Sequence, residues 1–192
     1  VIFLLRVATI GLVSGFLVAD GSMIQAYNEG FEKYNIEDGN FRTGERLYRG
    51  QKEAIEEEGV KVYENYYIEE ALDNGSTMRF FKNREQVNKV CLMEGEMPEG
   101  EDEIAIDRMY ADNNELSVGD IITEEESKRE WKITGLVALS DYSCLFQNNN
   151  DSMFDAVKFG VSVVTPEGFE ALNQNKLQYN YSWLYDKKPA NE

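Results

Sequence analysis

The sequence has no histidine, and only 2 cysteines and 3 prolines among its 192 residues. Without histidine, neither a Ser-His-Asp triad nor a histidine-bound zinc site can form. The two cysteines, Cys91 and Cys144, are too few for a metal cluster. Because both stand in apolar surroundings, a disulfide in an exported chain and two buried free thiols both remain open. The sequence also lacks a phosphate-binding loop, so we expect no nucleotide binding through that motif.

Basic residues are scarce as well. The chain has 19 Lys and Arg against 36 Asp and Glu, a formal net charge of -17. Such a chain repels phosphate backbones, which argues against nucleic acid as a partner. With so many acids, carboxylate pairs arise by chance, so they carry little information about a glycosidase. The polar run at Asn148–Asp155 lacks the spacing of a calcium loop. We interpret it as a solvated loop in which Asp151 or Ser152 caps a short helix.

Because these residue types and motifs are absent, the sequence offers no candidate catalytic site. We expect no catalytic residue, no cofactor-binding residue and no metal ligand, and therefore no cofactor. The chain is predicted not to be an enzyme. An exported hydrolase that uses two carboxylates remains an alternative, to be tested with glycoside and peptide substrates.

A long apolar run stands at the N-terminus. Residues Val1–Ala19 carry one charge, Arg6, and approach the ~20 residues that span a bilayer as a helix. An arginine near a helix end can reach the headgroups. A buried core helix is one alternative. A cleaved signal peptide is another, although Leu17-Val18-Ala19 fits a cleavage site poorly. We interpret residues 1–19 as part of a retained first transmembrane helix.

The helix is predicted to continue beyond the membrane as a stalk over residues 20–38. Ile24, Tyr27, Phe31 and Tyr34 are spaced three, four and three residues apart, which places them on one helical face. This apolar stripe is the candidate element for coupling the membrane to the domain that follows. The residues after the stalk are acidic, whereas cytoplasmic loops near membrane spans favour Lys and Arg. We therefore expect a cell-membrane protein whose chain lies outside the cytoplasm from about residue 20 onward.

Residues 39–192 have a mixed pattern of strands and short helices, which predicts an α+β domain with a mixed, mostly antiparallel sheet and short helices. Glycine closes a short helix at 52–59. The turn Asp73–Ser76 joins two strands as a hairpin. The last strand carries an aromatic face that a partner sheet or a neighbouring chain has to cover. The predicted strands are 60–72, 77–83, 89–94, 120–123, 129–139, 159–165 and 179–187, and the aromatic face is Tyr179, Tyr181, Trp183 and Tyr185.

The stretch between residues 94 and 123 is predicted to be scaffold and not a site. A strand runs through Ile104 and Ile106, and Asp107 caps the short helix that follows. Asn113 and Asn114 are expected to take left-handed geometry and end that helix. Gly119 then allows a tight turn into the next strand. No base or nucleophile stands here, so the stretch delivers the chain to a hairpin.

The order of these segments resembles the extracytoplasmic domain of FtsX-like ABC-transporter permeases, also called the MacB-like periplasmic core domain. The resemblance covers most of Val7 to Phe169, and it rests on the joint order of its segments because no motif is specific alone. The matching stretches are "GFLVADGSMIQAYNEGFEKYNIEDGNF" (15–41), "L..GEMPEG..EIAID" (92–107), "LSVGDIIT" (116–123) and "WKITGLVALSDY" (131–142).

The resemblance implies a permease subunit with several membrane helices that works with a cytosolic ATP-binding subunit, where ATP hydrolysis takes place. This chain would be the first span, the stalk and an extracytoplasmic core domain that is incomplete at its C-terminus. Its partners would be the bilayer, the ATP-binding subunit through the rest of the permease, and a second permease copy. No catalytic residue is implied. One departure from the family is the short first span, interrupted by Arg6. The alternative is a membrane-anchored extracellular binding module, such as an adhesin or receptor domain.

Overall fold

The structure is a computed structural model that describes residues 30–142, 144–147 and 153–187. The expected membrane span, the stripe residues Ile24 and Tyr27, and the proposed capping residues Asp151 and Ser152 lie outside the described residues. Within the described part of the chain, no helix has both the length and the apolar character needed to cross a bilayer.

The described residues form strands and a few short helices, and the strands from β2 to β6 follow one another without a helix between them. The helices are α2 (Arg49–Glu56), α3 (Arg108–Asn113) and α4 (Pro166–Glu170), with the 3-10 turns η1 (Ser140–Tyr142) and η2 (Gln174–Lys176). The strands are β1 (Gly39–Thr43), β2 (Val60–Glu64), β3 (Tyr67–Ala71), β4 (Thr77–Lys82), β5 (Cys91–Gly95), β6 (Glu103–Asp107), β7 (Ile121–Thr123), β8 (Glu130–Ala138), β9 (Phe159–Val164) and β10 (Tyr179–Tyr185).

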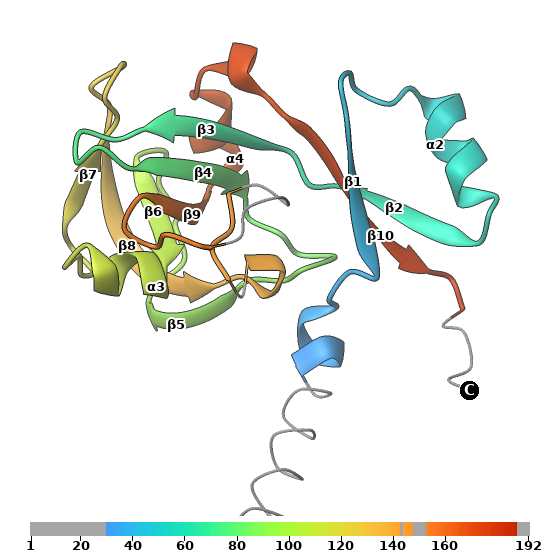
Figure 1. Cartoon of the computed structure of the whole chain (residues 1–192), viewed down its shortest axis with the longest axis horizontal. Coiled ribbons are helices and arrows are strands. Elements are labelled where there is room, and N and C mark those ends of the chain that lie inside the picture. Colours follow the sequence, from blue (N-terminus) through green and yellow to red (C-terminus); the bar gives the residue numbers. More distant parts are fainter. Residues whose placement is uncertain (1–29, 143, 148–152, 188–192) are drawn as a thin grey trace, which may run out of the picture.

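The strands form two sheets that lie side by side (Figure 1). The small sheet has the order β1-β10-β2, with both pairings antiparallel. The large sheet has the order β3-β4-β9-β6-β8-β5, and β7 pairs with β8 beside this path. The pairings β4–β9 and β6–β8 are parallel, whereas the others are antiparallel. The predicted α+β domain with mixed, mostly antiparallel sheets is therefore confirmed.

The small sheet is built from the two ends of the described chain. Strands β1 and β2 precede the large sheet in sequence, whereas β10 follows it and lies between them. The helix α2 connects β1 to β2, so the three strands and one helix form a unit into which the whole large sheet is inserted (Figure 1).

The single strand predicted over residues 60–72 is wrong. The chain leaves the small sheet after Glu64 and begins the first strand of the large sheet at Tyr67. Asn65 marks the break, because its backbone N–H donates to the carbonyl of Asn180 (2.8 Å) and its side-chain amide donates to Ser182 Oγ (3.1 Å). The alternation of apolar residues already fails at Glu64. The sequence of the two short consecutive strands otherwise resembles that of one long strand.

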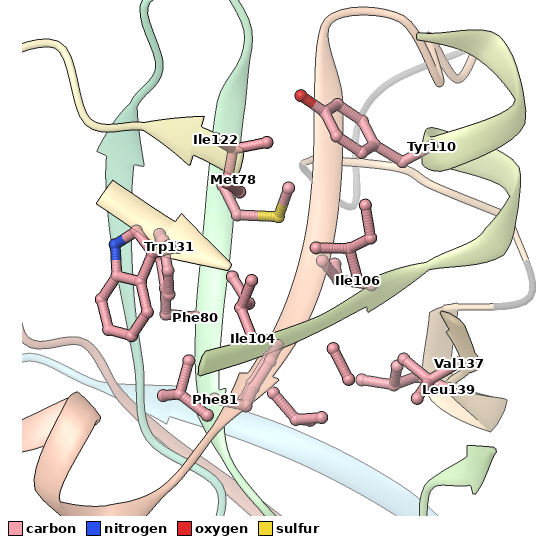
Figure 2. Close-up of a cluster of buried hydrophobic side chains, with 14 of the residues drawn as sticks. Met78, Phe80, Phe81, Ile104, Ile106, Tyr110, Ile122, Trp131, Val137 and Leu139 are labelled. Atoms are coloured by element: carbon pink, nitrogen blue, oxygen red, sulfur yellow. The ribbon is translucent and has the colours of Figure 1, made fainter. Parts of the chain in front are cut away.

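The main core lies in the large sheet, whose central strands are covered on both faces. All six residues of β9 are buried, which explains its continuous apolar sequence without alternation. Trp131 is fully buried with its ring 5.2 Å from that of Phe80, and its indole N–H donates to Glu124 Oε1 at 2.8 Å. Figure 2 shows these rings at one side of the cluster next to Ile104 of β6, with Tyr110 of α3 and Val137 of β8 at the other side. Each such side chain contributes roughly 1.5–3 kcal/mol of burial free energy.

The aromatic face of β10 is covered within the chain itself. Tyr181 is buried, stacks on Phe41 at 5.3 Å and lies edge-on to Tyr66 at the same distance. Its hydroxyl accepts the backbone N–H of Leu47, in the connection that leads to α2. Only the end of the face is open, where the side chain of Tyr185 is exposed. A partner sheet or a neighbouring chain is thus not required for most of this surface.

The stretch between residues 94 and 123 folds largely as predicted. The Asp107 carboxylate accepts the backbone N–H groups of Met109 (2.8 Å) and Tyr110 (3.1 Å) and so caps α3. The predicted left-handed asparagine is wrong, because Asn114 has a φ of -109° and the positive φ falls on Glu115. Asn114 ends the helix with its side chain, which donates to the carbonyl of Tyr110 at 3.0 Å. The strand after Gly119 pairs with β8 as expected.

Replacing Asp107 by Ala should lower the free energy of unfolding by about 1–2 kcal/mol, because two N–H groups at the start of α3 lose their acceptor. Urea denaturation measures this change. The control is Asp112→Ala, on the same helix but exposed, where we expect a loss below roughly 0.5 kcal/mol. Equal losses in the two variants would contradict the cap.

Candidate functional site: the junction of the stalk with the two sheets

The described end of the predicted stalk is bonded to the segment that precedes β5. Residues 30–34 are helical, and the hydroxyl of Tyr34 donates to Cys91 Sγ at 2.8 Å. The carbonyl of Tyr34 accepts the backbone N–H of Lys89 (2.8 Å), and the carbonyl of Asn35 accepts that of Asn88 (3.0 Å). Tyr34 and Asn35 are thus bonded through their backbone to the segment before β5, and Tyr34 is also bonded through its side chain to the first residue of β5.

Asn88 is the residue that joins these segments. It is fully buried and has a φ of +47°, a left-handed conformation that asparagine tolerates better than most residues. Its side-chain oxygen accepts the backbone N–H of Glu37 (2.9 Å), and its side-chain amide donates to Glu37 Oε2 (2.6 Å). The same amide lies 3.5 Å from Ser182 Oγ on β10. From the connection between β4 and β5, one side chain therefore contacts both the end of the predicted stalk and the small sheet.

The end of the stalk is also fixed directly to the small sheet. The backbone N–H of Asp38 donates to the carbonyl of Trp183 (3.0 Å), and the Asp38 carboxylate accepts the backbone N–H of Tyr185 (2.9 Å). The indole of Trp183 lies over Gly39, where an added Cβ would come within 2.6 Å of the ring. Only glycine allows β1 to begin this close to Trp183.

A buried ion pair holds the two sheets together beside this junction. Arg84 and Asp141 have side chains that are 7% and 8% exposed, with nitrogen–oxygen distances of 2.5 and 3.0 Å. Arg84 also donates to Asn65 Oδ1 at 3.3 Å, at the point where the chain leaves the small sheet. Asn65 in turn donates to Ser182. The pair belongs to the large sheet and reaches the small sheet through these two polar side chains.

The electrostatics of the junction favour a protonated carboxyl at Glu37. Burial raises the pKa of Glu37, and the negative charge of Asp141 raises it further. Hydrogen bonds from Ser182, Asn40 and Asn88 act in the opposite direction and are the weaker influence in sum. Burial at this junction therefore favours the protonated form of Glu37.

The structure places only part of the predicted stripe. Phe31 and Tyr34 are half-buried at the domain end of the stalk, whereas Ile24 and Tyr27 are outside the described residues. Both cysteines are free thiols, Cys91 half-buried and Cys144 exposed, so neither the disulfide nor the burial of both thiols holds. Among the described residues, no three side chains are placed to hold a metal ion.

Sequence patterns did not reveal the polar residues of the junction. Ser182 lies within β10, and each of the others is a single polar residue in a connection, without periodicity; the partner of each lies far along the chain. The only trace in the sequence was the failure of strand alternation before Asn65. The residues that the structure brings together in this way are Glu37, Asn65, Arg84, Asn88, Asp141 and Ser182.

No protein-family model matches the sequence. No curated protein matches it either. The solved structures that are similar to this chain include three domains. A domain of a protein described as a permease from Porphyromonas gingivalis has 17% identity and a TM-score of 0.38, with 73% of this chain and 68% of that chain covered.

The second is the periplasmic region of MacB from Actinobacillus actinomycetemcomitans, with 9% identity, a TM-score of 0.42, and coverage of 78% of this chain and 74% of that chain. The third is the extracellular domain of the noncanonic ABC-type transporter YknZ from Gram-positive bacteria. It has 10% identity and a TM-score of 0.41, with 78% and 83% covered. The first is described as a domain of a permease and the third as a domain of a transporter. The second is described as the periplasmic region of MacB.

Replacing Asp141 by Ala should lower the free energy of unfolding by about 3–5 kcal/mol, because the Arg84 guanidinium stays buried without its counter-ion. The double variant Arg84→Met with Asp141→Leu should recover much of this loss. In the exposed pair of Arg49 and Glu53, Glu53→Ala should cost less than about 0.5 kcal/mol. Urea denaturation compares the variants. A loss in Asp141→Ala no larger than in Glu53→Ala would show that the buried pair is not holding the sheets.

The raised pKa of Glu37 predicts a pH dependence of stability. Above pH 4.5, its ordinary value, the folded chain holds the Glu37 proton more tightly than the unfolded chain does. The stabilisation from this proton is present at low pH and is lost as the pH rises through the raised pKa. The free energy of unfolding of the wild type should therefore fall relative to that of Glu37→Gln between pH 4 and 8. The exposed Glu58→Gln controls for net charge. A constant difference would refute the prediction.

Proposed function

We propose that the chain is the first membrane span, the stalk and the extracytoplasmic domain of an ABC-transporter permease subunit of the FtsX-like family. ATP hydrolysis belongs to a separate cytosolic subunit, and the chain itself is not an enzyme. The domain lies outside the cytoplasm and couples events in the membrane to export or to mechanical signalling. The observation that carries the proposal is the joint order of the resembling segments over most of Val7 to Phe169.

The architecture of the junction supports this role. Rotation or tilt of a membrane helix is useful only if the far end of the stalk is rigidly held. Here the end of the stalk is bonded to the segment before β5 through Asn35 and Asn88, and to β10 through Asp38. A movement of the stalk therefore loads both sheets at once. Coupling of this kind needs an element that both ends bias, and we propose the stalk stripe as that element.

In this proposal, one end of the stripe anchors the stalk to the domain and the rest of it packs against another helix. Tyr34, at the domain end, is bonded to Cys91 and belongs to the anchor. Ile24, Tyr27 and Phe31 would pack on a second helix of the same subunit or on a second permease copy. Transport would then depend on the apolar character of the stripe and not on the polar residues between its members.

A membrane-anchored extracellular binding module is the second candidate. The observation that favours it is a cleft of about 860 Å³ between the two sheets, described in the next section. The coding sequence downstream of Glu192 discriminates between the two: further membrane spans support the permease, and a stop codon supports the binding module.

Replacing Phe31 by Asp should uncouple ATP hydrolysis from transport in the assembled transporter. The change places an unpaired charge in the proposed helix seam, which costs several kcal/mol when the group is desolvated. Glu32→Lys, on the exposed face of the same turn, should leave coupling intact, with a stability change below roughly 0.5 kcal/mol. The measurement is the ratio of substrate moved to ATP hydrolysed at equal expression. Equal ratios in the two variants would remove the stripe as the coupling element.

A further inference from the structure

A cleft separates the two sheets on the side of β2. It has a volume of about 860 Å³, within the range of small-molecule sites. One wall comes from β2 and the residues just after it, and the other from the end of β4, the segment 82–87 and α4. Boundaries between folding units are preferred positions for ligand sites, because neither unit alone can enclose the ligand.

The charge of the cleft is opposite to that of the molecule. In a chain with 19 basic and 36 acidic residues, five cationic side chains line this cleft against three carboxylates. The cationic side chains come from both walls of the cleft, with Lys61 on β2 and Lys82 at the end of β4. The five are Arg46, Lys52, Lys61, Lys82 and Arg84, and the carboxylates are Glu64, Glu85 and Glu170. Low-dielectric walls concentrate such a local field inside a cleft.

Two of these cations are available to a ligand. Among the described residues Lys61 has no ion-pair partner, and its ammonium lies over the Tyr63 ring at 5.4 Å. The one ion pair of Lys82 among the described residues is a long contact, 3.5 Å, to the exposed carboxylate of Glu170, and its ammonium also lies over the Phe169 ring at 5.3 Å. Exposed pairs of that kind are weak and exchange readily with other anions.

A third cationic group that lines the cleft, the Arg84 guanidinium, has an unused donor. Arg84 lines the cleft and is more than nine-tenths buried, and its Nε–H has no hydrogen-bond partner among the described residues. Its other donors are taken by Asp141 and Asn65. A buried donor without a partner is costly, and an acceptor that enters the cleft would relieve that cost.

The remaining lining is aromatic. Tyr63, Tyr66 and Tyr179 line the same cleft, and the rings of Tyr66 and Tyr179 are fixed edge-to-face at 5.3 Å. Rings held in this way offer a flat apolar surface next to the cations. The cleft thus combines positive charge with an apolar wall, which suits a ligand that has an acid group on a flat apolar body.

We propose that the cleft between the two sheets binds a small organic anion, whose acid group lies among Lys61, Lys82 and Arg84 and whose apolar body packs on the tyrosine rings. The site goes beyond the transporter proposal, because binding requires only the two sheets and not the membrane or an ATP-binding subunit. The ligand would also bridge the sheets and so stabilise one relative placement of them.

Isothermal titration calorimetry of the full chain in zwitterionic detergent tests the site, with detergent alone as the blank. The probe is naphthalene-2-sulfonate, for which we expect saturable binding with a Kd of about 1 mM or tighter. The neutral naphthalene-2-sulfonamide should bind at least about tenfold more weakly, since it lacks the charge. Inorganic sulfate should also bind at least about tenfold more weakly, since it lacks the apolar body.

The variant Lys61→Gln with Lys82→Gln should weaken sulfonate binding roughly tenfold. The matched control is Lys132→Gln with Lys158→Gln, which removes the same charge from exposed positions outside the cleft and should leave the Kd unchanged. Absence of saturable binding by the wild type, equal weakening in both double variants, or equal affinity for the sulfonamide would overturn the proposal. Equal affinity for sulfate would overturn the proposed ligand class.

Discussion

The buried ion pair of Arg84 and Asp141 is the constraint on which the arrangement of the two sheets depends. Two opposite charges removed from water are stable only while both are present, because either one alone would be a buried charge without a counter-ion. Asn65 can take part only if the small sheet lies where it does, because its side chain reaches from Arg84 to Ser182. The pair therefore selects one placement of the sheets among the many that apolar contact alone would allow.

Much of the fold follows from local sequence signals. The turn at Asp73–Ser76, the cap at Asp107 and the alternation along β8 are each decided by residues within a few positions, so the predictions there are confirmed. The break after Glu64 was not foreseen, because what divides the strand is a hydrogen bond from Asn65 to β10, more than a hundred residues further along the chain. The periodicity of apolar residues along a strand indicates which face of the strand is buried, but not which sheet the strand belongs to.

The polar residues of the junction were harder to predict from the sequence, because their partners also lie far along the chain. Its polar side chains have no local pattern, and the energy of each depends on a partner in another element. The stalk stripe was visible because four apolar residues repeat with the helical period, whereas the anchor beneath it rests on Asn35, Glu37 and Asn88. In a chain with this many carboxylates, the environment that distinguishes Glu37 appears only once the chain is folded.

The central position of β10 has a consequence for synthesis of the chain. Strands β1 and β2 emerge from the ribosome first, yet the strand that pairs with both of them is the last described strand to appear. Until then each has unpaired backbone groups along its length, and such edges readily pair with other chains. The large sheet has all its strands by Val164 and is able to fold in the interval. Assembly of the small sheet thus comes last, and the base of the predicted stalk, already able to bond to the segment before β5, is joined to the small sheet only when translation reaches Ser182 and Trp183.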